Sequence, residues 1–411
     1  MTSTAPIAII GAGLSGLSLA LALHSHDISC VLYETQGSPL DIGGALMLSP
    51  NALRILDRLN VYKTLEPLSY RFEHLYFRSG KDELVDEFEF GSAEKYGYPA
   101  LRTYRYELIN VLLDLVKKAG IPIEYGKKFD HVISETDQGV TWQFSDGSEA
   151  QASLLIGADG IHSRVRQYLY PGLVAKFTNM VGISSAIPTS QLKAGDDYPI
   201  PVTIMNPKHG AFVIAPQFAD GSEAFIGKQY LFTGPEPDRE GWRKLNADKQ
   251  WAVDHLRNGY EDFPPIVGNA TSSISADKIN LWPFYLLPKL DNWASEKHNR
   301  VIIVGDAAHA LPPTAGQGVN QAFEDVYILS GVLGKLRSDS QLGAPDKVQK
   351  ALKNWQNGRQ GRVDRILELN AQISKRRMPT AEPVEIKPIE LAWLYGADFD
   401  SMVEEYAGNL E

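Results

Sequence analysis

The stretch that decides the fold is residues 7–16, with the sequence IAIIGAGLSG. Its first four residues are all apolar, which is typical of a buried parallel strand. Residues 14–24 then carry apolar side chains on nearly all faces, as expected of a helix packed under a sheet. Residues 28–34 form a second apolar run and predict the next strand. This strand–helix–strand order predicts an α/β fold that starts a doubly wound parallel sheet.

The glycines between the first strand and the helix indicate a phosphate-binding turn. Gly11, Gly13 and Gly16 allow a tight turn, close approach of the backbone to a pyrophosphate, and close helix–strand packing. Glu34 follows eighteen residues after Gly16, at the end of the second strand, where a carboxylate can accept hydrogen bonds from a ribose diol. An acid at this position favours an unphosphorylated ribose. A surface carboxylate at a strand end is the plainer alternative.

Two further segments repeat the pattern of a strand followed by an aspartate and a glycine-containing turn. Residues 157–166 read GADGIHSRVR, and Asp159 could either face a ligand or cap the following helix. Residues 301–309 read VIIVGDAAH and place Asp306 at a strand end. Residues 312–318, PPTAGQG, then lead into a helix expected to begin near Val319. Ligands of such sheets bind outside the carboxyl ends of the strands, where helix N-termini stabilise negative charge.

Together, the three motifs make the chain resemble the single-component FAD-dependent aromatic hydroxylases of the para-hydroxybenzoate hydroxylase type. The resemblance covers most of the chain and is carried by GAGLSG, GADGIHSRVR and GDAAHALPPTAGQG in this order. It extends to SPNAL at 49–53 and YRYEL at 104–108. The chain is most similar in character to salicylate-hydroxylase-like and fungal secondary-metabolite monooxygenases, whose tail resembles WLY at 393–395.

The resemblance implies FAD as the cofactor. The ADP half would lie on the glycine turn and Glu34, Arg105 would reach the phosphates or ribityl chain, and Asp306 would bind the ribityl hydroxyls. Many relatives have a basic residue after the ribose-binding acid, whereas this chain has Thr35. The expected FAD contacts are Gly11, Gly13, Leu14, Ser15, Gly16, Glu34, Thr35, Arg105, Asp159, Asp306, Pro313, Gly316, Gly318 and Val319.

The sequence contains no second GxGxxG motif for a separate nicotinamide domain. NADPH, or else NADH, is therefore expected to visit the flavin transiently, as the resemblance implies. Arg164 and Arg166 are the candidate contacts to its phosphate.

The resemblance implies a monooxygenase that uses NAD(P)H and O2, through a 4a-hydroperoxyflavin, to hydroxylate or epoxidise an aromatic or other electron-rich small molecule. One alternative is a flavin oxidoreductase, such as a dehydrogenase or double-bond reductase, that does not use O2 as co-substrate. A non-enzymatic flavin-binding sensor is a third hypothesis. The sequence does not identify the substrate.

The catalytic base is open. Tyr230 and Lys228 lie on an expected strand, but alternation alone does not show which face meets the flavin. His309 could donate a proton, or it could be a packed, hydrogen-bonded histidine. Cys30 is expected to be a small core residue. The nine histidines show no metal-ligand spacing, so no metal is expected.

We expect a discontinuous FAD-binding domain, an inserted antiparallel-sheet domain for the substrate, and a helical C-terminal part. Their predicted ranges are 1–72, 99–182 and 275–336 for the first, 73–98 and 183–274 for the second, and 337–411 for the third.

Composition excludes several classes of function. The chain has 411 residues, 44% hydrophobic and 22% charged, close to the average for globular proteins. A net charge of −10 argues against nucleic acid or an anionic membrane as the partner. Residues 6–23 are apolar but lack a basic leader and are interrupted by glycines, so neither a signal nor a membrane span is expected. The expectation is a cytoplasmic monomer or homodimer.

Overall fold

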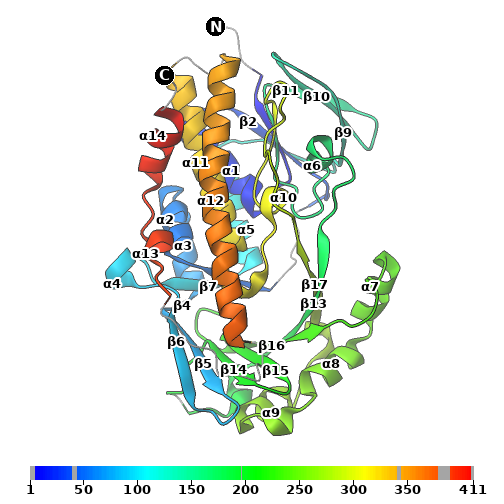
Figure 1. The fold of residues 1–411 in the computed structure, drawn as a ribbon, viewed down its shortest axis with the longest axis vertical. Coiled ribbons are helices and arrows are strands. Elements are labelled where there is room, and N and C mark those ends of the chain that lie inside the picture. The colour runs from blue at the N-terminus through cyan, green and yellow to red at the C-terminus, as the bar shows by residue number, and fades with distance from the viewer. Residues whose placement is uncertain (1–4, 39–43, 196, 340–343, 378–388, 409–411) are drawn as a thin grey trace.

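The computed structural model describes residues 5–38, 44–195, 197–339, 344–377 and 389–408. Two main sheets lie towards opposite ends of an elongated molecule, and the long helix α12 (Pro345–Arg377) runs from one end to the other (Figure 1). Trp355, Ile366 and Leu369 of this helix are buried, as the sequence predicts.

The first main sheet is parallel and five-stranded, in the order β18-β12-β1-β2-β8. Its strands are β1 (Ile7–Ile10), β2 (Cys30–Glu34), β8 (Ile123–Tyr125), β12 (Leu155–Gly157) and β18 (Val301–Ile303). The fully buried β1 explains the continuous apolar run of the sequence. The predicted α/β fold is confirmed.

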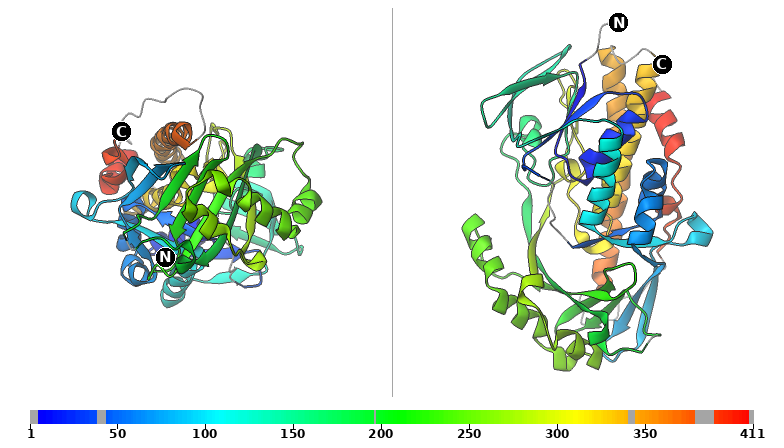
Figure 2. Two further views of the ribbon diagram at one scale, coloured as in Figure 1. Left: turned by 90° about the horizontal axis from the view of Figure 1, so that it is seen from below. Right: turned by 180° about the vertical axis from the view of Figure 1, so that it is seen from behind.

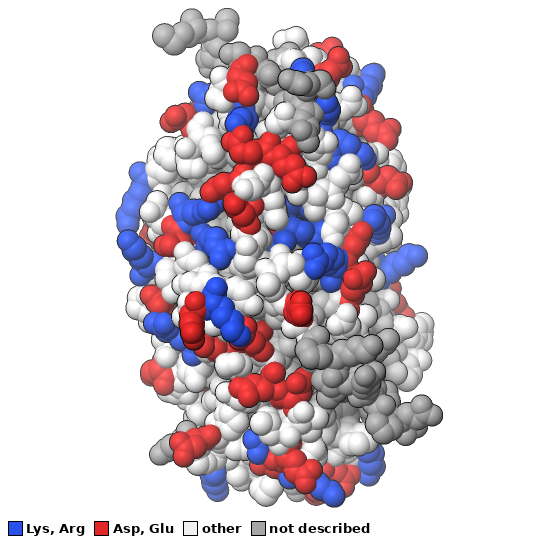
Figure 3. Space-filling view, turned by 60° about the vertical axis from the view of Figure 1, so that its left-hand side comes forward, with Lys and Arg blue, Asp and Glu red and all other residues white. Residues whose placement is uncertain are grey.

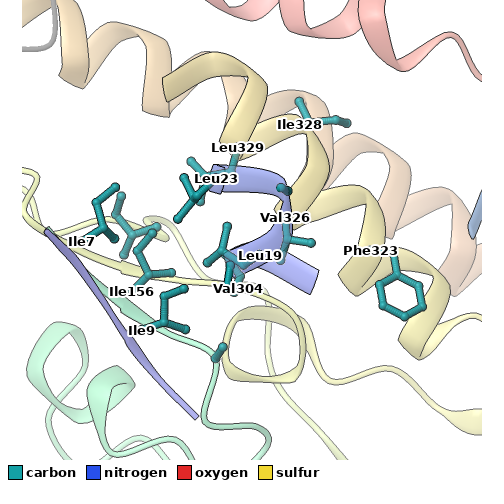
Figure 4. Close-up of a cluster of buried hydrophobic side chains, with 14 of the residues drawn as sticks. Ile7, Ile9, Leu19, Leu23, Ile156, Val304, Phe323, Val326, Ile328 and Leu329 are labelled. Carbon is teal, nitrogen blue, oxygen red and sulfur yellow. The ribbon is translucent and has the colours of Figure 1, made fainter. Parts of the chain in front are cut away.

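Three helices pack together beside this sheet: α1 (Leu14–His24), α5 (Arg105–Lys118) and α11 (Gly318–Ser338). α1 is buried on nearly every face because it lies between the sheet and α11 (Figure 2). Figure 4 shows the resulting core, which includes Ile7, Ile9, Leu19, Leu23, Val326 and Leu329.

The second main sheet has seven strands in the order β17-β13-β16-β15-β14-β5-β6. Its pairings are antiparallel except for the parallel pair β14–β5. The strands are β5 (His74–Ser79), β6 (Leu84–Glu89), β13 (Lys176–Pro188), β14 (Val202–Asn206), β15 (Gly210–Pro216), β16 (Glu223–Leu231) and β17 (Asn280–Leu286).

This sheet differs in two ways from the expected insert. It takes in β17 and the start of β13, which lie outside the predicted range 183–274. One face is covered by helices that the sequence did not predict, α7 (Arg239–Ala247), α8 (Lys249–Arg257) and α9 (Pro265–Thr271) (Figure 2). α8 packs there through buried Ala252, Val253 and Leu256.

Smaller sheets and helices complete the fold. A three-stranded antiparallel sheet consists of β9 (Phe129–Thr136), β10 (Gly139–Phe144) and β11 (Glu149–Ala152). Another consists of β3 (Ala45–Leu48), β7 (Ala100–Tyr104) and β4 (Tyr70–Phe72). The short helices are α2 (Pro50–Arg58), α3 (Tyr62–Leu65), α4 (Ala93–Tyr96), α6 (Val165–Leu169), α10 (Asp306–His309), α13 (Ala392–Tyr395) and α14 (Phe399–Gly408).

The surface shows no single dominant charge on the face drawn in Figure 3, where acidic and basic side chains are interspersed. Among the described helices, none is both long and apolar enough to cross a membrane.

Candidate functional site

A cavity of about 920 Å³ lies between the glycine turn and the seven-stranded sheet. Its polar end is formed by the turn after β1 and the end of β2, including Gly13, Glu34 and Gln36. Its other end is formed by apolar residues of the seven-stranded sheet and the small β3–β7 sheet, including Met47, Leu75, Val213, Ala215 and Phe225. This volume is at the upper end of what small-molecule and cofactor sites occupy.

The three glycines of the turn have three different roles. Gly11 has a φ of +104°, and a Cβ there would meet the Ala158 carbonyl oxygen at 2.6 Å. At Gly16 a Cβ would lie 1.9 Å from the Gly11 carbonyl oxygen, so only glycine lets α1 pack this close. A Cβ at Gly13, by contrast, would meet no atom of the described residues within 4 Å. Gly13 therefore has no packing reason to be glycine, and it lines the cavity.

Glu34 holds the turn in place from β2. Its Oε2 accepts a hydrogen bond from the Ala12 amide at 2.9 Å, and its Oε1 accepts one from the Gln36 amide at 2.9 Å. Each carboxylate oxygen keeps acceptor capacity beyond this one bond. Thr35 is exposed and does not belong to the cavity wall, where Gln36 and Ser38 are found instead.

Arg105 lines the cavity from the start of α5, and Asp306, the first residue of α10 after the strand β18, lies near Arg105. Burial lowers the pKa of Arg105, and the nearby Asp306 carboxylate opposes this. Asp306 is exposed to solvent, yet the protein around it desolvates the carboxyl and raises its pKa. The positive charges of His309 and Arg105 act in the opposite direction and lower that pKa. The two side chains thus carry opposite charges close to each other, with Arg105 in the cavity wall.

The loop 312–318 is clamped on several sides. Asn320 Nδ2 donates to the Gly316 carbonyl at 2.7 Å and to the Met47 carbonyl at 3.1 Å. The Ala315 amide donates to Asn370 Oδ1 at 2.8 Å. Gly316 has a φ of +62°, and a Cβ there would press on Met47 at 2.9 Å. This places the Pro313 end of the loop in the cavity wall.

Some of the expected FAD contacts lie away from the cavity wall. Leu14 is buried in the core, and Ser15 faces Gly305, whose Cβ position is 2.8 Å from Ser15 Oγ. Val319 packs partly buried against the core. At Gly318, as at Gly13, a Cβ would meet nothing within 4 Å.

Asp159 takes the capping role that the sequence left open. Its Oδ2 accepts hydrogen bonds from the amides of Arg164 at 2.8 Å and Val165 at 3.2 Å, at the start of α6. Its Oδ1 is buried without a partner among the described residues. Burial raises the pKa of this carboxyl, against the hydrogen bonds that it accepts.

The two nicotinamide candidates differ. Arg166 is only 1% exposed and donates to the carbonyls of Ala307 at 3.0 Å and Ile161 at 2.7 Å. This enclosure argues against the predicted contact between Arg166 and the phosphate of a visiting cofactor. Arg164 is exposed and pairs with Asp130 at 3.0 Å.

The candidate bases on β16 point away from the cavity. Lys228 borders it, but its ammonium donates to the Asn258 carbonyl at 2.8 Å and lies 5.6 Å from the Phe263 ring centroid, on the helix-covered face. Burial lowers its pKa to about 8. Tyr230 lies on that same face, with its ring centroid 4.8 Å from that of His255. The structure therefore argues against both as bases, because the cavity-facing side chains of β16 alternate with them.

His309 belongs to a buried charge cluster that joins α10, α11 and α12. Its Nε2 contacts Asp325 Oδ2 at 2.5 Å, and its ring packs on Trp293. Arg359 pairs with Asp325 at 2.8 Å and also with Glu324, and Arg362 pairs with Glu324 at 2.5 Å. We call His309, Glu324, Asp325, Arg359 and Arg362 the buried charge cluster. His309 is thus a packed, hydrogen-bonded histidine.

The cluster also holds the turn before α10 and the start of α2. Asp325 Oδ2 accepts from the Gly305 amide at 2.9 Å, and Glu324 Oε1 accepts from Asn51 Nδ2 at 2.7 Å. Desolvation acts to raise the pKa of Glu324, but Arg362 and Arg359 outweigh it and hold that pKa below its usual value. The paired arginines explain how two carboxylates remain charged at this depth.

Sequence reasoning missed Arg102, a buried arginine of β7 that lines the cavity. Its Nη2 donates to Gln217 Oε1 at 3.3 Å, and its Cζ lies 5.2 Å from the Phe225 ring centroid. An arginine within the apolar strand 100–104 was the only available signal.

Two expectations about reactive groups can be compared with the structure. Cys30 is buried on β2, and burial raises the pKa of its thiol to about 12, as suits a core residue. Within the described ranges, His, Cys, Asp and Glu form no group that could hold a metal ion.

A family model described as "FAD binding domain" matches residues 4–340 of this chain. The chain belongs to the FAD binding domain family. Its resemblance to FAD-dependent aromatic hydroxylases is thereby confirmed, and it is an enzyme of this flavoprotein group.

Named relatives of this FAD binding domain protein include two enzymes from bacteria. A 3-amino-4-hydroxybenzoate 2-monooxygenase of Streptomyces platensis is 27% identical over 401 residues, which cover 95% of each chain. A salicylate hydroxylase of Pseudomonas putida is 26% identical over 97% of this chain and 93% of its own. The crystal structure of CtdE with FAD and substrate has the same fold, with a TM-score of 0.79 at 19% identity, over 99% of this chain and 98% of that one.

Proposed function

We propose that this enzyme inserts one atom of O2 into an aromatic or other electron-rich small molecule, with NAD(P)H as the electron donor. The observation that carries the proposal is the continuity of the cavity. A single space runs from the glycine turn and Glu34, past Arg105 and Pro313, to an apolar chamber on the seven-stranded sheet. It can accommodate a dinucleotide cofactor at one end and an apolar substrate at the other.

The polar end fits FAD. Gly13 offers open space at the N-terminus of α1, where backbone amides and the helix dipole favour a pyrophosphate. Glu34 presents spare acceptor capacity for a ribose diol. Arg105 would neutralise phosphate charge, and Asp306 would accept from ribityl hydroxyls. Thr35, exposed off the cavity wall, would contribute little.

The loop 312–318 would position the ring system of the cofactor. Asn320 and Asn370 hold its backbone, so the loop does not need to reorganise when a ligand binds. α11 begins directly after it and directs its N-terminal dipole at the same place, which favours negative charge there. Bound FAD would supply electron transfer and the activation of oxygen.

The apolar end would hold the substrate and exclude water. Its walls are aliphatic and aromatic, with Leu75, Val213, Ala215, Phe225 and Trp282 among them. Exclusion of water protects reactive oxygen chemistry from side reactions. The relatives named for 3-amino-4-hydroxybenzoate and salicylate support an aromatic substrate. NADPH or NADH would enter transiently, with Arg164 left as the exposed candidate contact.

The proposal is tested on the purified protein with a panel of aromatic compounds under ¹⁸O-labelled dioxygen. NAD(P)H consumption and product mass are followed together. We expect a yellow protein, faster NAD(P)H oxidation with a suitable compound, and a product that carries one labelled oxygen. A product formed at full rate without oxygen indicates a reductase instead. Bound FAD without NAD(P)H oxidation by any compound indicates a sensor.

A further inference from the structure

Arg102 is a buried cation that the described protein does not neutralise. The side chain is 6% exposed, and its Nε has no hydrogen-bond partner among the residues that the structure describes. Within the described ranges it forms no ion pair, whereas the buried Arg359 and Arg362 each pair with a carboxylate. Arg166 is also buried without an ion pair, but it donates to two backbone carbonyls and is not part of the cavity wall. An isolated buried charge is strongly unfavourable, so an arginine in this position calls for an anion.

A chain of hydrogen bonds holds Arg102 in place without neutralising it. Gln217 Oε1 accepts from Arg102, and Gln217 Nε2 donates to the Tyr104 hydroxyl at 2.9 Å. Tyr104 in turn donates to Glu223, whose other oxygen accepts from Lys278. The acid at the end of this chain of hydrogen bonds, Glu223, is therefore already paired with Lys278. The network fixes the guanidinium and leaves its charge unpaired.

The surroundings of Arg102 suit a ligand with an apolar body and one anionic group. Arg102 and Phe225 both line the cavity, together with Leu75, Val213 and Ala215. Guanidinium groups bind carboxylates through paired N–H donors, and such charge-assisted bonds are strong where water is excluded. Arg105 lies three residues further along the chain, at the start of α5 and near Asp306, so the two arginines would serve different ligands.

We propose that Arg102 binds a carboxylate, or an equivalent planar anion, on the substrate, and that this enzyme therefore takes aromatic or other apolar organic acids. The inference rests on the proposed function, because it names the substrate class of the same cavity. The alternative ligand of Arg102 is FAD, and the experiment below distinguishes binding of the substrate from binding of FAD.

The experiment measures binding to the FAD-loaded protein by equilibrium dialysis. The probes are benzoate, 2-naphthoate and indole-3-carboxylate, each compared with its own neutral amide. We expect wild type to prefer acid over amide by about ten-fold or more, since a hydrogen bond to a charged group contributes about 1.5–3 kcal/mol. Arg102→Met should abolish this preference while FAD binds as in wild type, and Arg102→Lys should restore part of it.

Three results would overturn the inference. Wild type could show no preference for acid over amide in any pair. Arg102→Gln, a second variant that retains polarity, could keep the full preference. Arg102→Met could lose FAD while still folding, by circular dichroism, like wild type, which would assign Arg102 to the cofactor. Insertion of labelled oxygen into neutral compounds, without any acid preference, would leave the proposed function intact and remove only this inference.

Discussion

The buried charge cluster and the cavity wall both contain buried arginines, but these differ in whether the protein supplies an oppositely charged partner. In the cluster, Arg359, Arg362, Glu324 and Asp325 all find partners of opposite charge inside the protein. At the wall, the described part of the chain supplies no partner of opposite charge to Arg102 and no atom to the space beside Gly13. The difference teaches that satisfied groups hold the fold together, whereas unsatisfied groups at a cavity mark where ligands bind.

The largest expected effect comes from breaking the cluster. Arg359→Met removes one positively charged partner from Glu324 and one from Asp325. Removing one member of a buried ion pair lowers the free energy of unfolding by about 3–5 kcal/mol. Urea unfolding of the FAD-free protein should show a loss of this size. Arg243→Met, which removes an exposed pair with Glu240, is the control and should leave stability nearly unchanged. Equal midpoints for the two variants would show that the cluster does not stabilise the fold.

The next effect is on cofactor binding at the polar end. Glu34→Gln keeps the size of the side chain but removes the charge that accepts from Ala12 and Gln36 and would accept from a ribose. We expect FAD affinity to fall about ten- to hundred-fold, from the value of a charge-assisted hydrogen bond. Titration of the apoprotein, followed by flavin fluorescence, measures it. Glu124→Gln on the neighbouring β8, an exposed change, should bind FAD normally.

A smaller effect is expected on the pH dependence of stability, through Lys228 on the helix-covered face of the seven-stranded sheet. Burial lowers the pKa of Lys228 to about 8 from its ordinary 10.5, so the folded state binds this proton less well than the unfolded state. Stability should therefore rise as pH increases from about 8 to about 10.5. Lys228→Met should lack this rise. In thermal unfolding, the Tm of wild type should therefore increase relative to that of the variant as the pH is raised. Parallel curves for the two proteins would contradict the burial of the charge.

Much of the fold could be predicted because its signals are local. The apolar run of β1, the start of α1 and the turn glycines depend on neighbours in sequence, and the structure confirms them. Helices α7 and α8 were missed inside a region that otherwise indicates strands. Their capping residues Asp238 and Asp248, which accept from Gly241 and Trp251, were the signals available.

The site was harder to predict because its contacts join distant segments. Nothing near Arg102 in sequence shows that Gln217 and Phe225 meet it, or that no acid does. Likewise, alternation placed Lys228 and Tyr230 on one face of a strand, but only the packing of α8 and α9 shows that this face is not the cavity. The division of the chain into domains stays a prediction.

The most direct test of the central claim compares two glycines of one turn. Gly16→Ala drives a Cβ against the Gly11 carbonyl and should destabilise the fold, whereas the Cβ of Gly13→Ala would meet no atom within 4 Å in the described ranges. We predict that Gly13→Ala unfolds like wild type but binds FAD about ten-fold more weakly or worse, since overpacking costs about 1–3 kcal/mol. If Gly13→Ala binds FAD as tightly as wild type, the space at Gly13 is not where the pyrophosphate lies, and the account is contradicted.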